Sequence, residues 1–180
     1  MFSVAKFVPA ATRRFGRDTS GHTVVEFALV ALPFFLLMFG LAEIGLIGFA
    51  QSSLDHAVAD TARRIRTGEA QGAGDSYTQV QTTLCNEMSQ LMAITCDDNL
   101  FLDVDTFASF VAVQNTSPIQ NGNLQTNQFG YTPGAASSIV VVRAYYRWHV
   151  LTPVFQGVFA NLSGGDRLLV STMMFRNEPF

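Results

Sequence analysis

The dominant pattern of the chain is one long apolar segment near its N-terminus. Residues 24–50 are almost entirely apolar, and only Glu26 and Glu43 carry charge within them. The 16 uncharged residues between these glutamates would span roughly 24 Å as an α-helix, slightly less than the roughly 30 Å hydrocarbon core of a bilayer. The pattern therefore predicts a membrane-spanning helix, which Pro33 is expected to kink.

Beyond residue 50 the apolar positions take on the spacing of an amphipathic helix. They recur every three or four residues as far as Ile65, and Thr67-Gly68 is a typical stop. Residues 71–74 read as a loop, and Asp75 or Ser76 is expected to cap a second helix that ends before Cys96. The first helix thus continues out of the apolar segment into a domain.

Alternating polar and apolar positions replace this spacing from residue 100 onward. Strands are predicted over 100–105, 137–150 and 167–175, with a long loop at 114–134 and a short helix at 152–162. The expected fold is α+β: a long N-terminal transmembrane helix extending into a small exported domain with a second helix and an antiparallel sheet.

Charge divides the chain into two parts. Residues 1–21 carry a net charge of +3 and the remainder −6, which favours a cytoplasmic N-terminus by the positive-inside rule. We therefore expect a cytoplasmic leader at 1–21, a transmembrane helix at 22–50 and an exported α+β domain at 51–180. No basic patch suits a nucleic acid, because the short cluster at 63–66 is typical of a solvated helix face.

An ordinary cleavable signal peptide is an alternative interpretation of the N-terminus. Gly48-Phe49-Ala50 resembles a small-x-small cut site. The apolar run is longer than the usual span of about 7–15 residues in such signals, which favours a retained helix.

Glu26 lies near the expected cytoplasmic end of the apolar segment, where an ionised carboxylate needs either a shallow position in the membrane or a cationic partner. A charge at the centre of a membrane helix costs roughly 2.5–3.5 kcal/mol, and less near the interface. A cut after Gly21 would give His22 a new α-amine close to Glu26, and glycine offers no side chain to obstruct a peptidase. The alternative is that Glu26 and Glu43 sit near opposite interfaces without a special role.

The residue types needed for catalysis are scattered. His22, His56 and His149 lie far apart and match no catalytic motif. The aspartates between 97 and 105 lack the spacing of a known calcium loop, so a solvated strand edge is favoured over a weak calcium site. We expect no enzyme activity, no cofactor and no bound metal.

The chain has two cysteines, Cys85 and Cys96. They are consistent with an oxidising compartment, where a disulfide between them would close a short loop. Two buried free thiols are the alternative, and zinc is disfavoured because no histidine or further cysteine lies near in sequence.

Four stretches together resemble one known family. They are residues 15–33 (FGRDTSGHTVVEFALVALP), 40–45 (GLAEIG), 57–64 (AVADTARR) and the ending 175–180 (FRNEPF). They are similar to TadE-like proteins, the minor pilins or pseudopilins of bacterial tight-adherence (Tad, Flp-type) pili. TadF relatives share related openings, whereas TadG relatives are normally far longer.

This resemblance implies a role in assembling a pilus for surface adhesion and biofilm formation. It implies cleavage between Gly21 and His22 by a prepilin peptidase, and assembly through Glu26 and Phe27. The implied partners are the inner membrane, the peptidase, other pilins and Tad assembly proteins. The major pilins of such systems are much shorter and often carry Glu-Tyr, so Glu26-Phe27 and a large exported domain indicate a minor subunit. A membrane-anchored scaffold outside the fibre, or an anchored exported enzyme, are the alternatives.

Overall fold

The computed structural model describes residues 20–91, 96–114 and 117–180. The expected leader therefore lies, apart from its last two residues, outside the described part of the chain. The chain divides into two compact units, Met1–Leu41 and Ala42–Phe180. The second unit holds the sheet and the described helices, apart from the N-terminal part of the helix Ser20–Arg66, which belongs to the first unit.

Helix α2 (Ser20–Arg66) is a single helix of 47 residues with Pro33 inside it. By length and composition it could cross a membrane. Its extent confirms that the apolar segment and the amphipathic stripe beyond residue 50 form one continuous helix. Arg66 ends it one residue before the predicted stop.

The second unit contains a three-stranded antiparallel sheet. Its strands are β1 (Leu100–Phe107), β4 (Ile139–His149) and β5 (Asp166–Arg176), in the order β1-β4-β5. Three shorter helices accompany it among the described residues: α3 (Glu69–Ala73), α4 (Tyr77–Leu91) and α5 (Pro153–Phe159). Two 3₁₀ turns, η1 (Asp97–Asn99) and η2 (Phe110–Ala112), flank β1. The predicted α+β fold is confirmed.

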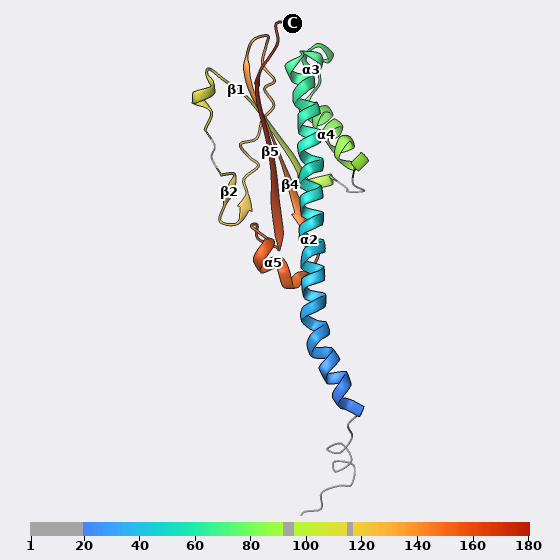
Figure 1. Cartoon of the computed structure of the whole chain (residues 1–180). Coiled ribbons are helices and arrows are strands. Elements are labelled where there is room, and N and C mark those ends of the chain that lie inside the picture. Colours follow the sequence, from blue (N-terminus) through green and yellow to red (C-terminus); the bar gives the residue numbers. More distant parts are fainter. Residues whose placement is uncertain (1–19, 92–95, 115–116) are drawn as a thin grey trace, which may run out of the picture. The chain divides into compact units, whose positions relative to one another are not determined.

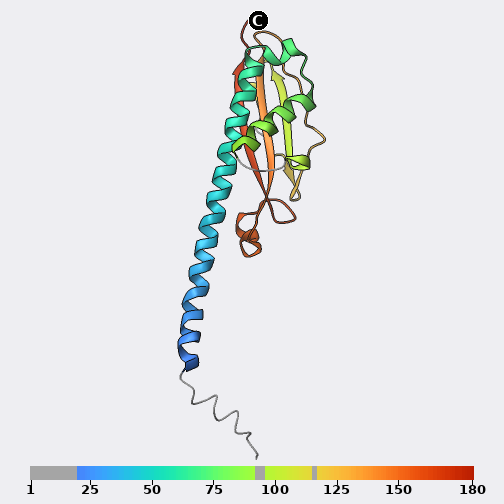
Figure 2. The ribbon, with the colours of Figure 1, turned by 90° about the vertical axis from the view of Figure 1, so that its right-hand side faces the viewer.

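Helix α4 and the C-terminal half of α2 cover one face of the sheet (Figures 1 and 2). The core between them takes every second residue of each strand, because successive side chains of a strand point to opposite faces. Its fully buried members include Leu54, Val58, Leu84, Met88, Leu102, Val104, Val140 and Val142. The Ser53 hydroxyl also donates a hydrogen bond to the Met88 carbonyl at 3.1 Å, which joins α2 to α4.

The opposite face of the sheet carries a smaller cluster. Tyr145 stacks on Phe129 with ring centroids 4.7 Å apart, and Leu124, Leu162 and Leu168 pack around them. Part of the predicted loop 114–134 forms the hairpin β2 (Ile119–Gln120) and β3 (Asn123–Leu124). Asn121 and Gly122 make its turn with positive φ, the conformation that favours Asn-Gly in two-residue hairpins.

Cys85 of α4 and Cys96, just before η1, form a disulfide. Of the two open interpretations of the cysteines, the bridge is therefore the one that the structure holds. It joins the helix layer to the start of β1 and bears on the stability of the helix–sheet packing.

Candidate functional site

The N-terminal part of α2 exposes a nearly continuous apolar surface. Phe27 is 70% exposed and Leu29 is 71% exposed, and most large apolar residues from Val24 to Phe39 have comparable values. A patch of this size is unfavourable in water, so it requires lipid or another protein surface. One apolar N-terminal helix is compatible with a single-pass membrane protein.

Gly21, His22, Glu26 and Phe27 occupy the first two turns of α2. The imidazole Nδ1 of His22 lies 3.0 Å from a carboxylate oxygen of Glu26, one helical turn away. Both side chains are largely exposed, and nothing lies within 4 Å of the position where a Cβ on Gly21 would stand. The geometry brings the expected cut and the expected assembly carboxylate together on one short segment, while the cut and the assembly role themselves remain predictions.

The surroundings of Glu43 differ from the alternative that it lies near a membrane interface without a special role. It is only 2% exposed and lies in the second unit. Its carboxylate accepts hydrogen bonds from the backbone amides of Leu151 and Thr152, both at 3.1 Å, and from the Thr152 hydroxyl at 3.0 Å. The indole Nε1 of Trp148 approaches it at 3.5 Å.

The donors to Glu43 come from the segment that joins β4 to α5. Leu151 and Thr152 stand just before α5, which begins at Pro153, so their backbone amides have no acceptor within the helix and need another partner. The carboxylate of Glu43 supplies that partner from α2. Sequence reasoning missed this role, because it placed Glu43 only by its distance along the apolar helix.

The C-terminal segment closes against the end of α2. Asn177 is buried, and its side-chain amide donates to the carbonyls of Pro133 and Ala135, both at 3.0 Å. The backbone N–H of Glu178 donates to the Arg66 carbonyl at 2.9 Å, and their side chains form an ion pair. The ending that resembles the TadE-like family therefore anchors the chain terminus to the helix and the loop before β4.

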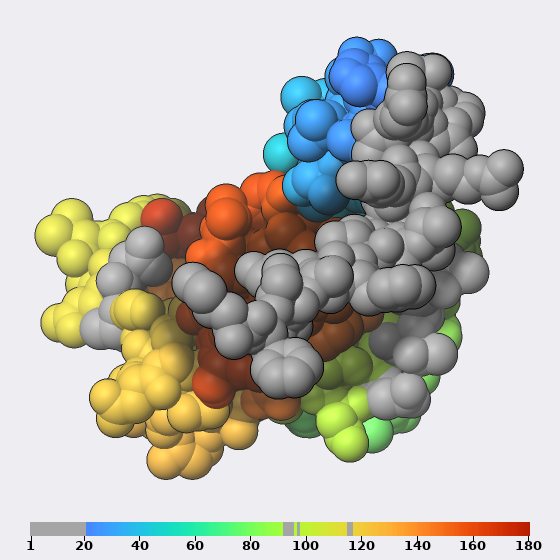
Figure 3. Space-filling view, turned by 90° about the horizontal axis from the view of Figure 1, so that it is seen from below, coloured from blue at the N-terminus to red at the C-terminus, as the bar shows by residue number. Residues whose placement is uncertain are grey.

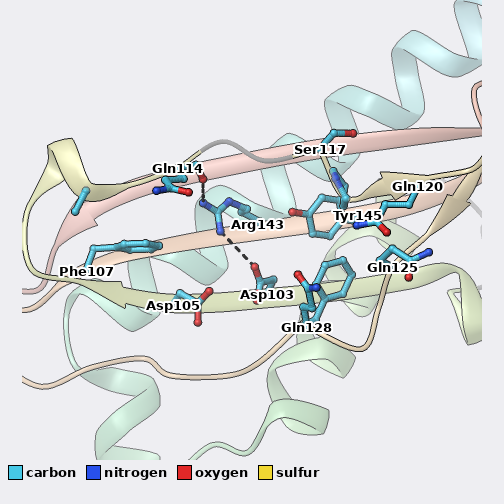
Figure 4. Close-up of a pocket in the computed structure, with 13 residues that line it drawn as sticks. Asp103, Asp105, Phe107, Gln114, Ser117, Gln120, Gln125, Gln128, Arg143 and Tyr145 are labelled. Atoms are coloured by element: carbon cyan, nitrogen blue, oxygen red, sulfur yellow. Dashed lines mark hydrogen bonds and ion pairs between the residues drawn. The ribbon is translucent and has the colours of Figure 1, made fainter.

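A polar cavity of about 390 Å³ lies on the sheet face away from α2 and α4 (Figure 4). Asp103 pairs there with Arg143 at 3.3 Å and accepts the Gly130 amide, while Arg143 also donates to the Gln114 carbonyl. Burial, and then the negative charge of Asp103, raise the pKa of Asp105 above its ordinary value.

The candidates for metal binding and catalysis do not converge on this cavity. Among residues 20–91, 96–114 and 117–180, no three His, Cys, Asp or Glu side chains gather as a metal site. His149 does not line the cavity, and its Nδ1 lies 2.8 Å from an Asp166 carboxylate oxygen on the neighbouring strand. This contact links His149 to the strand beside it.

Comparison with known proteins gives one match. The family model described as TadE-like protein matches residues 21–63, a range that begins at Gly21, includes Glu26 and Glu43, and ends within α2. No curated protein and no solved structure matches the chain significantly. The expected resemblance is therefore confirmed for this segment: the part of the helix that carries both glutamates is similar to the TadE-like family.

Proposed function

We propose that this chain is a minor pilin, or pseudopilin, that takes part in assembling a Tad (Flp-type) pilus for surface adherence and biofilm formation. The observation that carries the proposal is the TadE-like match over residues 21–63, on a helix whose apolar side chains are exposed. Such a helix suits storage in a membrane followed by packing against the helices of other subunits.

Processing after Gly21 by a prepilin peptidase completes the proposed assembly element. Before assembly, the protein would reside in the inner membrane with its N-terminus in the cytoplasm and its α+β domain on the opposite, extracytoplasmic side. After the cut, Glu26 would lie close to an α-amine, either its own or that of a neighbouring subunit. An unpaired carboxylate in a bundle of apolar helices is strongly disfavoured, so this pairing helps to set the register between subunits.

A non-enzymatic role fits the polar groups of the domain. The buried carboxylates of Glu43 and Asp103 and the side-chain NH₂ group of Asn177 make hydrogen bonds within the protein itself. Because these groups hold elements of the fold together, they are not held ready for a substrate. The proposal thus assigns the exported domain to assembly or partner contact.

The test separates processing from assembly. Glu26→Gln keeps the size of the side chain and one acceptor oxygen but removes its charge, so cleavage should remain and incorporation into sheared pili should fall. Gly21→Leu should block cleavage, seen as an unshifted band. Glu69→Gln, which removes an exposed charge in α3, is the matched control and should assemble normally.

Two results would count against the proposal. Normal piliation by the Glu26→Gln variant would remove the docking role. An intact N-terminus on protein isolated from membranes would remove the processing step. Processed protein that is absent from sheared pili by mass spectrometry would favour a membrane-anchored scaffold of the Tad machinery over a fibre subunit.

A further inference from the structure

Helix α5 presents an exposed apolar face in the second unit. Leu151, Val154 and Val158 are 60%, 67% and 74% exposed. Val154 and Val158 share one side of α5 because they lie four residues apart in it, and Leu151 lies two residues before the helix. Atoms of this segment, coloured orange, are visible at the surface in the view of Figure 3. The face therefore has no cover within the described part of the chain.

The sequence around α5 lacks charge altogether. Residues 150–165 contain no Asp, Glu, Lys, Arg or His, although the rest of the exported part is acidic overall. Phe155 and Phe159 lie on the same short helix with ring centroids 5.6 Å apart. Exposed apolar side chains, beside aromatic rings and without nearby charge, favour an apolar surrounding over water.

Glu43 holds this segment beside the apolar part of α2. Its three hydrogen bonds to Leu151 and Thr152 join the start of α5 to a position in α2. Exposed apolar side chains continue on α2 past this position, with Ile44 and Phe49 each 51% exposed. The segment that leads into α5 is thus attached to a part of α2 whose exposed side chains also favour an apolar surrounding.

The length of the apolar part of α2 indicates where along the helix the hydrocarbon core of the bilayer ends. From Glu26 to Glu43 the helix rises only about 26 Å. A hydrocarbon core of about 30 Å needs about 20 helical residues. If the core begins after Glu26, about 20 residues of helix end at Leu46. Lipid can extend past Glu43 because hydrogen bonds already shield its carboxylate. The bilayer boundary then falls at or beyond the level where α5 is attached.

We propose that α5 lies in the outer lipid–water interface of the bilayer, with Leu151, Val154 and Val158 in contact with lipid. The exported domain then contacts the membrane surface through α5. Glu43 attaches α5 to the spanning helix through its hydrogen bonds. This inference rests on the proposed membrane-spanning role of α2.

Tryptophan fluorescence of the full chain in phosphatidylcholine vesicles tests the proposal. Trp148 is the chain's one tryptophan, so Trp148→Phe gives a silent background for Val158→Trp. The matched control is Val111→Trp, at a position in η2 that is 95% exposed and that Figure 1 shows, in yellow, away from α5. Lipids brominated near the headgroup serve as quenchers.

The expected result is a blue shift and loss of emission for the tryptophan at 158, with emission at 111 unchanged. Equal, water-like emission at both positions would overturn the proposal. A blue shift at 158 without quenching by brominated lipid would overturn it in favour of a protein neighbour. If Trp148→Phe alters the circular dichroism spectrum, difference spectra of the same two variants in the parent chain give the same comparison.

Alkaline extraction distinguishes the two levels of the proposal. Chain that is released from the vesicles by alkali would contradict the membrane-spanning role of α2, and the interface proposal would fall with it. Chain that is retained while the tryptophan at 158 stays in water would overturn the interface proposal alone.

Discussion

Glu43 and Thr152 are joined by two hydrogen bonds, from the backbone N–H of Thr152 at 3.1 Å and from its hydroxyl at 3.0 Å. They lie 109 residues apart in the chain. The contact joins the long helix to the turn before α5, with the same carboxylate also accepting the Leu151 amide. A carboxylate in the apolar segment thus holds a segment that is distant in sequence in place within the α+β domain.

Glu43→Ala should destabilise the domain. It would leave the amides of Leu151 and Thr152 without their acceptor, at a cost of about 3 kcal/mol in the free energy of unfolding. Glu43→Gln retains one acceptor oxygen and should lose less. Urea unfolding of the full chain in detergent, followed by circular dichroism, measures the difference. Equal stability of the parent and Glu43→Ala would contradict the role of Glu43 in holding the segment before α5.

The disulfide between Cys85 and Cys96 should contribute about 2–4 kcal/mol, mainly by restricting the unfolded chain. The double variant Cys85→Ala/Cys96→Ala should therefore melt at a lower temperature than the parent. A reductant should lower the melting temperature of the parent and leave the double variant unchanged. Insensitivity of the parent to reductant would show that the bridge does not form in solution.

Asn177→Ala should lower the free energy of unfolding by about 1–3 kcal/mol, because the carbonyls of Pro133 and Ala135 would lose the donor that the buried Asn177 side chain supplies. Glu178→Gln is the neighbouring control. Its ion pair with Arg66 is about half exposed, and exposed pairs contribute at most about 1 kcal/mol. Thermal melting of the two variants should rank Asn177→Ala well below Glu178→Gln, and the reverse order would refute the anchoring role of the asparagine.

Asp105→Asn should stabilise the domain at neutral pH. Burial and the charge of Asp103 raise the pKa of Asp105 above its ordinary 3.8, so the folded state disfavours the ionised form. Stability of the parent therefore falls as pH rises from 3.8 through the raised folded value, and the difference from Asp105→Asn should vanish below both pKa values.

Unfolding of parent and Asp105→Asn across this pH range measures the effect. Asp103→Ala provides the contrast, since it would break the pair with Arg143 and leave the Gly130 amide without an acceptor. It should destabilise at neutral pH. A gap between parent and Asp105→Asn that widens toward acid would contradict the assigned cause.

Gly68→Ala should be destabilising for a steric reason. Gly68 has a φ of +80°, and a Cβ there would stand 2.3 Å from the ring of Phe180. Gly72→Ala is the matched control, because nothing lies within 4 Å of its Cβ position and alanine favours the helix. Melting temperatures should fall for the first variant and hold or rise for the second.

Periodicity alone determined most of the elements of this protein. The apolar run with its three- and four-residue continuation predicted α2, and the expected cap at Asp75 or Ser76 predicted the start of α4. Strict alternation predicted β1, and the β-branched and aromatic run predicted β4. These features are readable because a regular backbone repeats its exposure every 3.6 or 2 residues. The Asn121-Gly122 turn carried a local hairpin signal that the loop assignment overlooked.

Only the tertiary structure decided the roles of the isolated polar residues. Glu26 and Glu43 are the same residue type on one helix, yet the first side chain is 65% exposed and the second residue 2%. The donors to Glu43 lie more than 100 residues further along the chain, and the carbonyl acceptors of the Asn177 side chain lie more than 40 residues before it. A hydrophobic pattern records which side of an element is buried, but a hydrogen bond depends on which distant backbone group the fold brings within about 3 Å.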